Sequence, residues 1–496
     1  MFAPEQVRSI HFLGIGGSAM AGVAALLQRR GLRVTGSDEN VYPPMSAFLV
    51  EQGIPTLSPY AAENLERVGR PDLVVIGNVI RRGNPEAEAV LERHLRYASL
   101  PDVVREFFIR GRTSIVVTGT HGKTTTTSLL AWTFQRAGLA PGYMIGGIPL
   151  NLGQGCACPP LPPSLNFKPQ PSYFIIEGDE YDTAFFDKRS KFLHYLPDTV
   201  IINNIEFDHA DIFASLADIK LSFRRLVNII PRNGLLLVNG DDANAREVAS
   251  RAPATVHTFG LGPQSDFRAV DIHLGPDHTE FQVARPKLHA PLPRFRVPLV
   301  GRHNVLNTLA VIAAGLHHGL SPAQMQTAFD EFRGVKRRQE IRGEAAGGTV
   351  IDDFGHHPTA IRETLTALRV RFPGRRLWAV FEPRSNTTRR RVFQSELADA
   401  LAGADGAFVS KVDRLDELPE EERLQPERLV TDIAGRGRPA RYLPDAEAIV
   451  AALVPQTMPG DVIVVFSNGA FGGIHGKLLR ALQERQTTGT GSGSRL

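Results

Sequence analysis

The residues best suited to chemistry are Thr118–Thr125, TGTHGKTT, which follow the apolar run Ile115–Val117. A strand that ends in a glycine-rich turn and continues into a helix presents backbone N–H groups to a phosphate, and the helix N-terminus adds partial positive charge. In such a loop Lys123 reaches the outer phosphates of a nucleotide, and the hydroxyl of Thr124 contacts Mg²⁺. The predicted ATP-phosphate site comprises Gly119, Thr120, His121, Gly122, Lys123, Thr124 and Thr125.

The spacing of this loop departs from the common phosphate loop. The motif G-x-x-x-x-G-K-[ST] begins with glycine, whereas this chain has Val117 at that position. A shorter loop with Gly119 and Gly122 remains. The departure disfavours generic phosphate-loop motors and kinases as hosts for the motif.

Two acidic segments follow apolar strands that we expect beside this loop. Tyr173–Asp182 (YFIIEGDEYD) begins as a strand, and Glu177 stands where it ends. Asn203–Asp211 (NNIEFDHAD) follows another strand and carries His209 among carboxylates. Oxygen ligands at a strand end beside a phosphate loop are typical of Mg²⁺ sites. We therefore predict that Thr124, Glu177 and His209 hold magnesium, with a solvated acidic loop as the simpler alternative.

A second glycine turn lies near the N-terminus, between an expected strand and helix. Gly14–Ala19 (GIGGSA) fits the dinucleotide fingerprint with alanine in the last place, and Asp38 follows at about the distance used to bind a ribose. Taken alone, the turn indicates NAD(P) or FAD. Because the chain has a separate ATP loop, the turn could instead bind a nucleotide-linked substrate. The residues predicted to contact it are Gly14, Gly16, Gly17, Ser18 and Asp38.

Polar residues also follow three apolar strands in the last third of the chain. These segments are Val350–Pro358 (VIDDFGHHP), Phe381–Thr388 (FEPRSNTT) and Ser467–His475 (SNGAFGGIH). Open α/β sheets bind ligands at the carboxyl ends of their strands. We therefore expect one substrate site along one sheet edge. Upstream, Gly301–Asn307 (GRHNVLN) opens a helix, where Asn304 could cap the helix or contact a base.

The alternation of strand and helix signals predicts α/β architecture in three consecutive units. The expected strands are Ser9–Leu13, Arg33–Gly36, Asp72–Ile76, Tyr173–Glu177, Thr199–Asn203, Thr349–Asp352, Leu377–Phe381, Gly406–Ser410 and Val462–Phe466. We expect a Rossmann-like domain over residues 1–108, a phosphate-loop domain with a mostly parallel sheet over 109–334, and a second Rossmann-like domain over 335–485. Residues 486–496 lack large apolar side chains before Leu496 and are expected to be disordered. The proline-rich stretch Cys158–Ser172 is expected to be irregular.

The composition of the chain excludes several classes of protein. A net charge of +4 over 496 residues, without a basic run interleaved with aromatic residues, disfavours a nucleic-acid groove. The densest basic cluster, Arg389–Arg391, is expected on a solvated helix face. Two cysteines fit a reducing compartment, and the absence of a signal peptide or long apolar span favours a cytoplasmic protein without membrane insertion. We expect a monomer or a weak homo-oligomer.

The ordered set GIGG, TGTHGKTT, a carboxylate-ending strand, NIEFDH, GRHN, Arg337-Arg338 and DDFGHHP resembles the Mur ligase family of ATP-dependent, amide-forming enzymes. GIGG with DDFGHHP resembles the branch of that family that uses UDP-N-acetylmuramate. Within it, EYDTAFFDKRSK, FEPRSNT and SNGAFGGIHG resemble the member that adds the tripeptide L-Ala-γ-D-Glu-meso-diaminopimelate during murein recycling. The alanine-adding member is the nearest alternative, and an NAD(P)-dependent oxidoreductase is an alternative from another class. Gly178, where the family usually has alanine, is a departure.

The resemblance implies a role for each site. ATP would phosphorylate the muramate carboxylate, and the amine of the tripeptide would attack the acyl phosphate. Lys123, Glu177 and His209 would be catalytic, with Mg²⁺ as cofactor, while Asn304, Arg337 and Asp353 would hold adenine, phosphate and ribose. The implied peptide-binding residues are His356, His357, Arg384, Ser385, Asn386 and Asn468. No lysine matches the carbamylated lysine of some members, since Lys220 falls short of the usual spacing.

Overall fold

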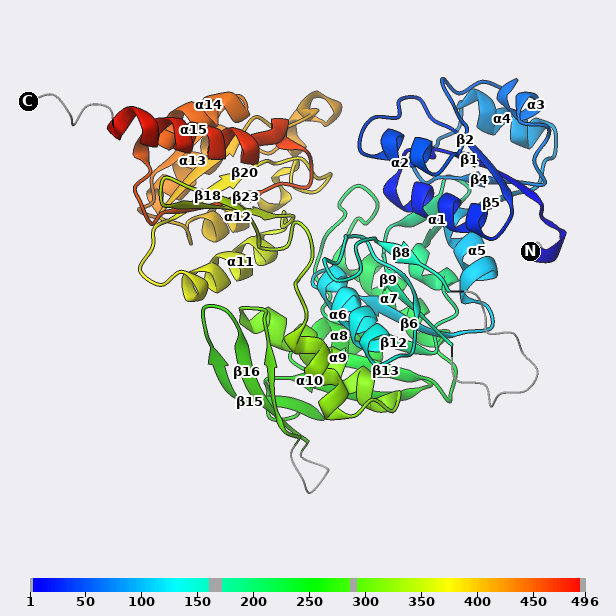
Figure 1. Ribbon diagram of the computed structural model, residues 1–496, viewed down its shortest axis with the longest axis horizontal. Helices are drawn as coiled ribbons and strands as arrows, with labels where there is room; N and C mark the ends of the chain where they lie inside the picture. The colour runs from blue at the N-terminus through cyan, green and yellow to red at the C-terminus, as the bar shows by residue number, and fades with distance from the viewer. Residues whose placement is uncertain (1–2, 160–171, 286–291, 491–496) are drawn as a thin grey trace, which may run out of the picture.

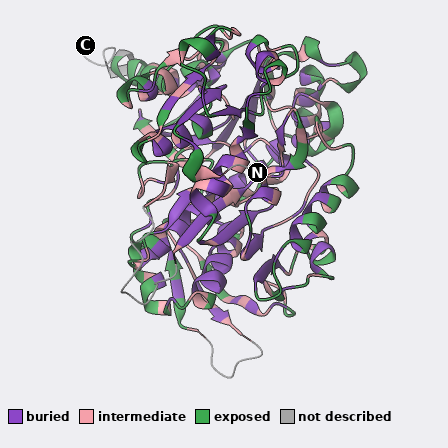
Figure 2. Ribbon diagram, turned by 90° about the vertical axis from the view of Figure 1, so that its right-hand side faces the viewer, coloured by how far each residue is buried: buried purple, intermediate pink, exposed green. Residues whose placement is uncertain are grey.

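A computed structural model describes residues 3–159, 172–285 and 292–490. Its chain forms three lobes, and the N-terminal and C-terminal lobes both lie against the central one (Figure 1). In each lobe the buried strands are covered by helices that turn exposed faces outward (Figure 2). Among the described residues, every helix is too short or too polar to span a bilayer. The prediction of three-part α/β architecture is confirmed.

The N-terminal lobe contains a parallel sheet in the order β3-β2-β1-β4-β5. All of these strands run parallel, but the strand order runs from β1 to β3 on one side and from β4 to β5 on the other. The end of β1 is therefore a switch point, where such sheets bind ligands. The glycine turn follows β1 at that point. The strands are β1 (Ser9–Leu13), β2 (Arg33–Ser37), β3 (Thr56–Leu57), β4 (Leu73–Ile76) and β5 (Tyr97–Ser99); the helices are α1 (Ser18–Arg29), α2 (Met45–Glu51), α3 (Asn64–Arg67), α4 (Pro85–Glu92) and α5 (Leu100–Val104).

The central lobe has a ten-stranded sheet within the described residues, in the order β17-β16-β15-β14-β13-β12-β6-β9-β7-β8. Its middle is parallel, and the pairs β15–β16, β16–β17 and β7–β8 are antiparallel. The strands are β6 (Thr113–Thr118), β7 (Gly142–Met144), β8 (Cys156–Ala157), β9 (Tyr173–Gly178), β12 (Thr199–Ile202), β13 (Leu235–Asn239), β14 (Thr255–Gly260), β15 (Phe267–Leu274), β16 (Thr279–Ala284) and β17 (Arg294–Val297). A separate hairpin joins β10 (Asp182–Ala184) to β11 (Asp187–Ser190).

Helices cover the central sheet, and one of them follows the phosphate loop directly. They are α6 (Lys123–Arg136), α7 (Leu216–Asn228), α8 (Ala243–Ala249), α9 (Arg302–His317) and α10 (Pro322–Asp330). Strand β6 lies between β12 and β9, so its end is also a switch point. Most of the proline-rich stretch Cys158–Ser172 lies outside the described residues.

The C-terminal lobe contains a sheet in the order β18-β19-β23-β20-β21-β22, parallel except for the β18–β19 pair. Its strands are β18 (Glu340–Ala345), β19 (Gly348–Asp353), β20 (Leu377–Phe381), β21 (Gly406–Ser410), β22 (Ala440–Leu443) and β23 (Val462–Phe466); its helices are α11 (Pro358–Arg371), α12 (Gln394–Leu401), α13 (Pro426–Gly435), α14 (Ala446–Leu453) and α15 (Ile474–Thr490). Since β19, β23 and β20 are parallel neighbours, their three polar ends lie along one edge, as predicted.

The expected disorder of residues 486–496 is wrong for its first part. Helix α15 continues through Thr490, because each further residue adds one backbone hydrogen bond to a helix that is already formed. Residues 491–496 lie outside the described residues. The three sheets fall within the divisions 1–108, 109–334 and 335–485, which we keep as proposed domains.

Candidate active site

Strand register brings the phosphate loop level with the first acidic segment. Val117 of β6 pairs with Glu177 of β9, so both strands end at the same height. Gly119 and Gly122 have φ angles of +131° and +80°, which L side chains rarely adopt. A Cβ on Gly119 would also lie 2.9 Å from the backbone of Asn204. The loop is therefore tight, and it requires glycine where the sequence has it.

The predicted magnesium ligands fall into two neighbouring groups. The Thr124 hydroxyl donates to Glu177 Oε1 at 3.0 Å. His209 Nε2 lies 3.0 Å from Glu180 Oε1, and Asp179 offers a further carboxylate to that cluster. The structure thus brings Thr124 to Glu177 but places His209 on Glu180, so the ligand set Thr124, Glu177 and His209 stays a prediction.

Glu180 links the two groups through the loop lysine. Lys123 Nζ donates to both carboxylate oxygens of Glu180, at 2.9 and 3.0 Å, and to the Gly119 carbonyl at 2.7 Å. The sequence reasoning did not select Glu180. Its only signal was membership of the acidic run after β9, which does not indicate which carboxylate turns toward the loop.

Mutual attraction keeps this cluster charged despite its burial. Burial disfavours the ammonium of Lys123, but Glu180 and Asp179 outweigh it and raise the pKa of Lys123. Burial likewise favours neutral Glu180, yet Lys123 and His209 hold the pKa of that carboxyl below its usual value. Burial would lower the pKa of His209, whereas Glu180 and Asp208 raise it to about 9. The site therefore holds a protonated imidazole between carboxylates at neutral pH.

The residues predicted to hold adenine, ribose and phosphate lie near the junction of the central and C-terminal lobes. The Asn304 amide donates to the Val300 carbonyl at 2.9 Å and accepts from Asn307 at 3.1 Å, so it secures the start of α9. Both carboxylate oxygens of Asp353 accept backbone N–H groups, from Gln339 at 2.9 Å and Gly355 at 2.8 Å. Their contacts with a nucleotide stay predictions.

Arg337 and Arg338 point to different places. Arg337 Nη2 donates to the carbonyls of Ser467 and Gly469, at 2.6 and 2.9 Å, within the C-terminal lobe. Arg338 Nη2 instead reaches Thr124 Oγ1 at 3.3 Å, across the lobe boundary. Arg338 is thus the arginine beside the phosphate loop, and sequence spacing alone did not separate it from its neighbour.

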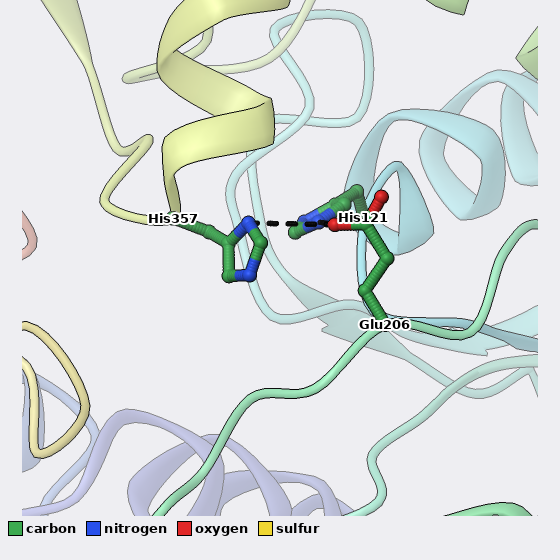
Figure 3. A group of neighbouring side chains, drawn as sticks. All are labelled: His121, Glu206 and His357. Carbon is green, nitrogen blue, oxygen red and sulfur yellow. Dashed lines mark hydrogen bonds and ion pairs between the residues drawn. The ribbon is translucent and has the colours of Figure 1, made fainter. Parts of the chain in front are cut away.

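The second histidine of DDFGHHP also crosses the lobe boundary, toward His121 and Glu206 (Figure 3). His121 Nε2 lies 3.0 Å from Glu206 Oε2, and His357 Nδ1 lies 3.5 Å from the same oxygen. His357 Nε2 is 3.1 Å from the carbonyl of Phe207, while Nδ1 accepts from Thr359 N at 3.2 Å as the cap of α11. Because protein groups already use both ring nitrogens of His357, we interpret this cluster as an interlobe contact rather than a ligand set.

The other predicted peptide-binding residues lie along the polar edge of the third sheet. His356 Nε2 is 3.7 Å from Asp208 Oδ2, and Ser385 Oγ is 2.8 Å from Thr388 Oγ1. The Arg384 side chain is 43% exposed, and its contacts with Glu382 and Asp413 are both 3.8 Å. Asn468 Oδ1 is buried without a hydrogen-bond partner among the described residues. Arg384 and Asn468 therefore keep hydrogen-bonding capacity for a ligand.

Asn386 differs from these residues because its amide is occupied by protein. Its Nδ2 donates to the Tyr181 hydroxyl at 2.9 Å and to Asp211 Oδ2 at 2.7 Å, both in the central lobe. Its Oδ1 accepts from Arg389 at 3.0 Å. The expectation of a solvated Arg389–Arg391 helix face is wrong for Arg389, which is buried because Asn386, Glu417 and the Arg414 carbonyl all accept from it.

The N-terminal glycine turn has the form expected of a phosphate-binding loop. Gly14 has φ +85° and donates to the Ser37 carbonyl at 2.8 Å. Gly16 N donates to Asp38 Oδ2 at 2.7 Å, so one oxygen of Asp38 secures the turn. Gly17 and Ser18 are exposed at the start of α1, where backbone N–H groups can receive an anion.

Comparison with known proteins explains why these sites occur together. Three family models match: "Mur ligase family, catalytic domain" over residues 9–112, "Mur ligase middle domain" over 117–315 and "Mur ligase, glutamate ligase domain" over 337–469. A relative from Haemophilus influenzae is 42% identical over 96% of this chain and 100% of its own length. The chain belongs to the Mur ligase family. The predicted class of ATP-dependent, amide-forming ligase is thereby confirmed.

The relatives themselves carry specific descriptions. Two relatives, from Haemophilus influenzae and Escherichia coli, are each 42% identical to this Mur ligase. Both are described as UDP-N-acetylmuramate–L-alanyl-γ-D-glutamyl-meso-2,6-diaminoheptandioate ligases. The match to the Escherichia coli protein covers 96% of this chain and 98% of the length of that protein. A Geobacter relative, 32% identical over 94% of this chain and 95% of its own, is described as a UDP-N-acetylmuramate–L-alanine ligase. The crystal structure of a murein peptide ligase from Psychrobacter arcticus is 35% identical, with a TM-score of 0.73 over 96% of this chain and 99% of that one.

Proposed function

We propose that this Mur ligase uses ATP to join UDP-N-acetylmuramate to the tripeptide L-Ala-γ-D-Glu-meso-diaminopimelate, as a step of murein recycling. The polar edge of the third sheet supports the proposal, because His357 places it against the second acidic segment, while Arg338, just before β18, reaches the phosphate loop. Relatives of 42% identity over nearly the whole chain support the choice of both substrates.

The first step activates the muramate carboxylate. A carboxylate oxygen forms a bond to the γ-phosphorus of ATP, and the bond between that phosphorus and the oxygen of ADP breaks. Lys123 stands at the mouth of the loop with a charge that Glu180 preserves. Its ammonium and the imidazolium of His209 offset the negative charge that gathers during transfer.

The residues around Thr124 fit a magnesium ion. Mg²⁺ prefers oxygen ligands, and the Thr124 hydroxyl and Glu177 carboxylate already face each other at 3.0 Å. The ion would neutralise charge on the phosphates when bound. Glu177 Oε2 also accepts from Gly146 N at 2.8 Å, which fixes the direction of the carboxylate.

The second step forms the amide. The free amine of the tripeptide attacks the acyl carbon, and the tetrahedral intermediate releases phosphate with the electrons of the C–O bond while the nitrogen loses a proton. Arg384 can bind a carboxylate of the tripeptide, and Asn468 Oδ1 can accept from one of its N–H groups. Contact of the third sheet edge with the central lobe, such as that of His357 with the Phe207 carbonyl, would help exclude water from an acyl phosphate that hydrolyses readily.

The same proposal covers the setting of the reaction. We expect a monomer or weak homo-oligomer in the cytoplasm, where ATP and UDP-linked precursors are available. The two free cysteines, Cys156 and Cys158, are consistent with a reducing compartment. Sedimentation across a concentration series and fractionation of the source cells would test both expectations.

One comparison of amine donors tests the function. Phosphate release is measured with UDP-N-acetylmuramate and ATP together with either the tripeptide or L-alanine. We expect faster turnover with the tripeptide. Faster turnover with L-alanine would assign the chain to the alanine-adding reaction instead, and no turnover with either donor would contradict the proposal altogether.

A further inference from the structure

A single hydroxyl from the C-terminal lobe contacts the residues on both sides of His209. Thr387 follows β20 and is 2% exposed. Its Oγ1 donates to Asp208 Oδ1 at 2.7 Å and accepts from Ala210 N at 3.4 Å. His209 lies between these two central-lobe contacts.

The backbone of His209 needs such support. Its φ angle is +55°, in the left-handed region that L residues other than glycine seldom occupy. Asp208 Oδ1, the atom that Thr387 contacts, also accepts the backbone N–H of His209 at 2.7 Å. One carboxylate oxygen therefore joins the hydroxyl of Thr387 to the strained residue.

The side chain of His209 carries this contact onward to the phosphate loop. His209 Nε2 lies 3.0 Å from Glu180 Oε1, and Glu180 binds Lys123 through both oxygens. All members of this path are buried or partly buried. A set of contacts therefore runs from the third sheet through His209 to the lysine of the phosphate loop.

We propose that Thr387 is a positioning residue for carboxylate activation: its hydroxyl holds the Asp208–Ala210 turn so that His209 supports Glu180 and Lys123. The inference rests on the proposed function and adds a role for the C-terminal lobe before any amine donor arrives. The hydroxyl supplies its one hydrogen to Asp208, so Thr387 has no donor left for the peptide. Its contacts with Asp208 and Ala210 instead support the residues around Lys123.

The first half of the reaction separates this role from amine binding. UDP-N-acetylmuramate and ATP are incubated without tripeptide, and the acyl phosphate is trapped with hydroxylamine as a hydroxamate. We expect Thr387→Val to lower the rate of hydroxamate formation by roughly tenfold or more, the effect of losing one well-placed hydrogen bond. Thr387→Ser, which keeps the hydroxyl, should restore most of the rate.

A matched control lies one residue away. Thr388 is equally buried, but its hydroxyl contacts Ser385 within the same lobe, at 2.8 Å. Thr388→Val should leave hydroxamate formation unchanged. This substitution also replaces a threonine hydroxyl with a methyl group in the same segment, but Thr388 does not contact the Asp208–Ala210 turn.

Hydrogen exchange provides a readout that does not depend on turnover. In the substrate-free protein, Thr387→Val should speed amide exchange in a peptide spanning 207–213, because Ala210 N–H loses its partner, whereas Thr388→Val should not. Normal hydroxamate formation by Thr387→Val would overturn the proposal, and a raised KM for the tripeptide in addition would place Thr387 in the amine site. If the wild-type protein forms neither hydroxamate nor ligated product, the proposed function fails, while unchanged exchange over 207–213 would separately refute the contact.

Discussion

Lys123 of the phosphate loop and Glu180 beyond β9 form a bidentate ion pair, with Nζ 2.9 and 3.0 Å from the two carboxylate oxygens. Only 14% of the lysine side chain and 2% of the glutamate side chain are exposed. A pair so deeply buried is costly to break, because the remaining charge loses its partner without regaining water. The pair therefore fixes the lysine before ATP binds.

Replacement of this lysine should separate catalysis from sugar binding. We expect Lys123→Ala to abolish ligation, since the charge that faces the transferring phosphoryl group is lost. UDP-N-acetylmuramate affinity, measured by calorimetry, should change little because the Gly14–Ser18 turn belongs to the N-terminal sheet. Urea unfolding should show that the free energy of unfolding falls by roughly 3–5 kcal/mol, the usual effect of removing one partner of a buried ion pair. Appreciable ligation by the variant would refute the catalytic role.

Adjacent arginines offer a second, internally controlled prediction. Arg338 reaches Thr124 at 3.3 Å, whereas Arg337 holds the carbonyls of Ser467 and Gly469. We expect Arg338→Ala to raise the KM for ATP by about tenfold or more, in line with a charge-assisted hydrogen bond. Arg337→Ala should loosen the segment that carries Asn468, and so raise mainly the KM for the tripeptide. Initial rates with each substrate varied in turn would distinguish the two, and the reversed pattern would restore the role predicted for Arg337.

Local patterns were enough to predict most strands that lead into the site. The apolar runs at Ser9–Leu13 and Leu377–Phe381 match β1 and β20, since a buried strand is nearly all hydrophobic whatever surrounds it. The tight turn of the phosphate loop could also be predicted from its glycines, because positive φ angles restrict the residue type. The three polar strand ends of the third sheet were predicted to share one edge, and β19, β23 and β20 are parallel neighbours.

What the sequence could not give is the direction of individual side chains across lobe boundaries. Glu177 and Glu180 lie in one acidic run, and only the fold shows that Lys123 pairs with Glu180. Asn386 and Thr387 were indistinguishable from ligand-binding residues until their partners in the central lobe were visible. Such contacts join residues far apart in sequence and leave no periodic signal.

Gly178, the departure from the usual alanine, makes a prediction about packing. A Cβ there would lie 2.7 Å from Val116 Cγ1 and 3.1 Å from Thr118 Cβ. We expect Gly178→Ala to destabilise the protein by about 1–3 kcal/mol, the range for overpacking a core. Urea unfolding provides the measurement.

Gly435 supplies the control for that substitution. It ends helix α13, and a Cβ there would meet nothing within 4 Å. Gly435→Ala should therefore be neutral or stabilise by up to about 1 kcal/mol, since alanine favours helix. Equal effects at both positions would mean that the close contact of Gly178 with Val116 does not decide its residue type.

The last prediction concerns stability at low pH and depends on His318. Its Nε2 is 3.1 Å from Thr199 Oγ1, and its ring packs edge-on against Phe134 and Tyr173. Burial, aided by His317, lowers the pKa of His318 to about 4 from the ordinary 6.5.

Between these two pKa values the unfolded chain binds more protons at His318 than the folded one. The contribution of His318 to the free energy of unfolding is thus fully present above about pH 6.5. It falls as the pH drops toward about 4, by up to about 3 kcal/mol. We expect His318→Gln to lose less stability than wild type between those pH values, measured by urea unfolding, because glutamine does not titrate. His273 is exposed, so the free energy of unfolding of His273→Gln should change with pH as that of wild type does. If His318→Gln also runs parallel to wild type as pH falls, burial of a neutral imidazole is not what weakens the fold in acid.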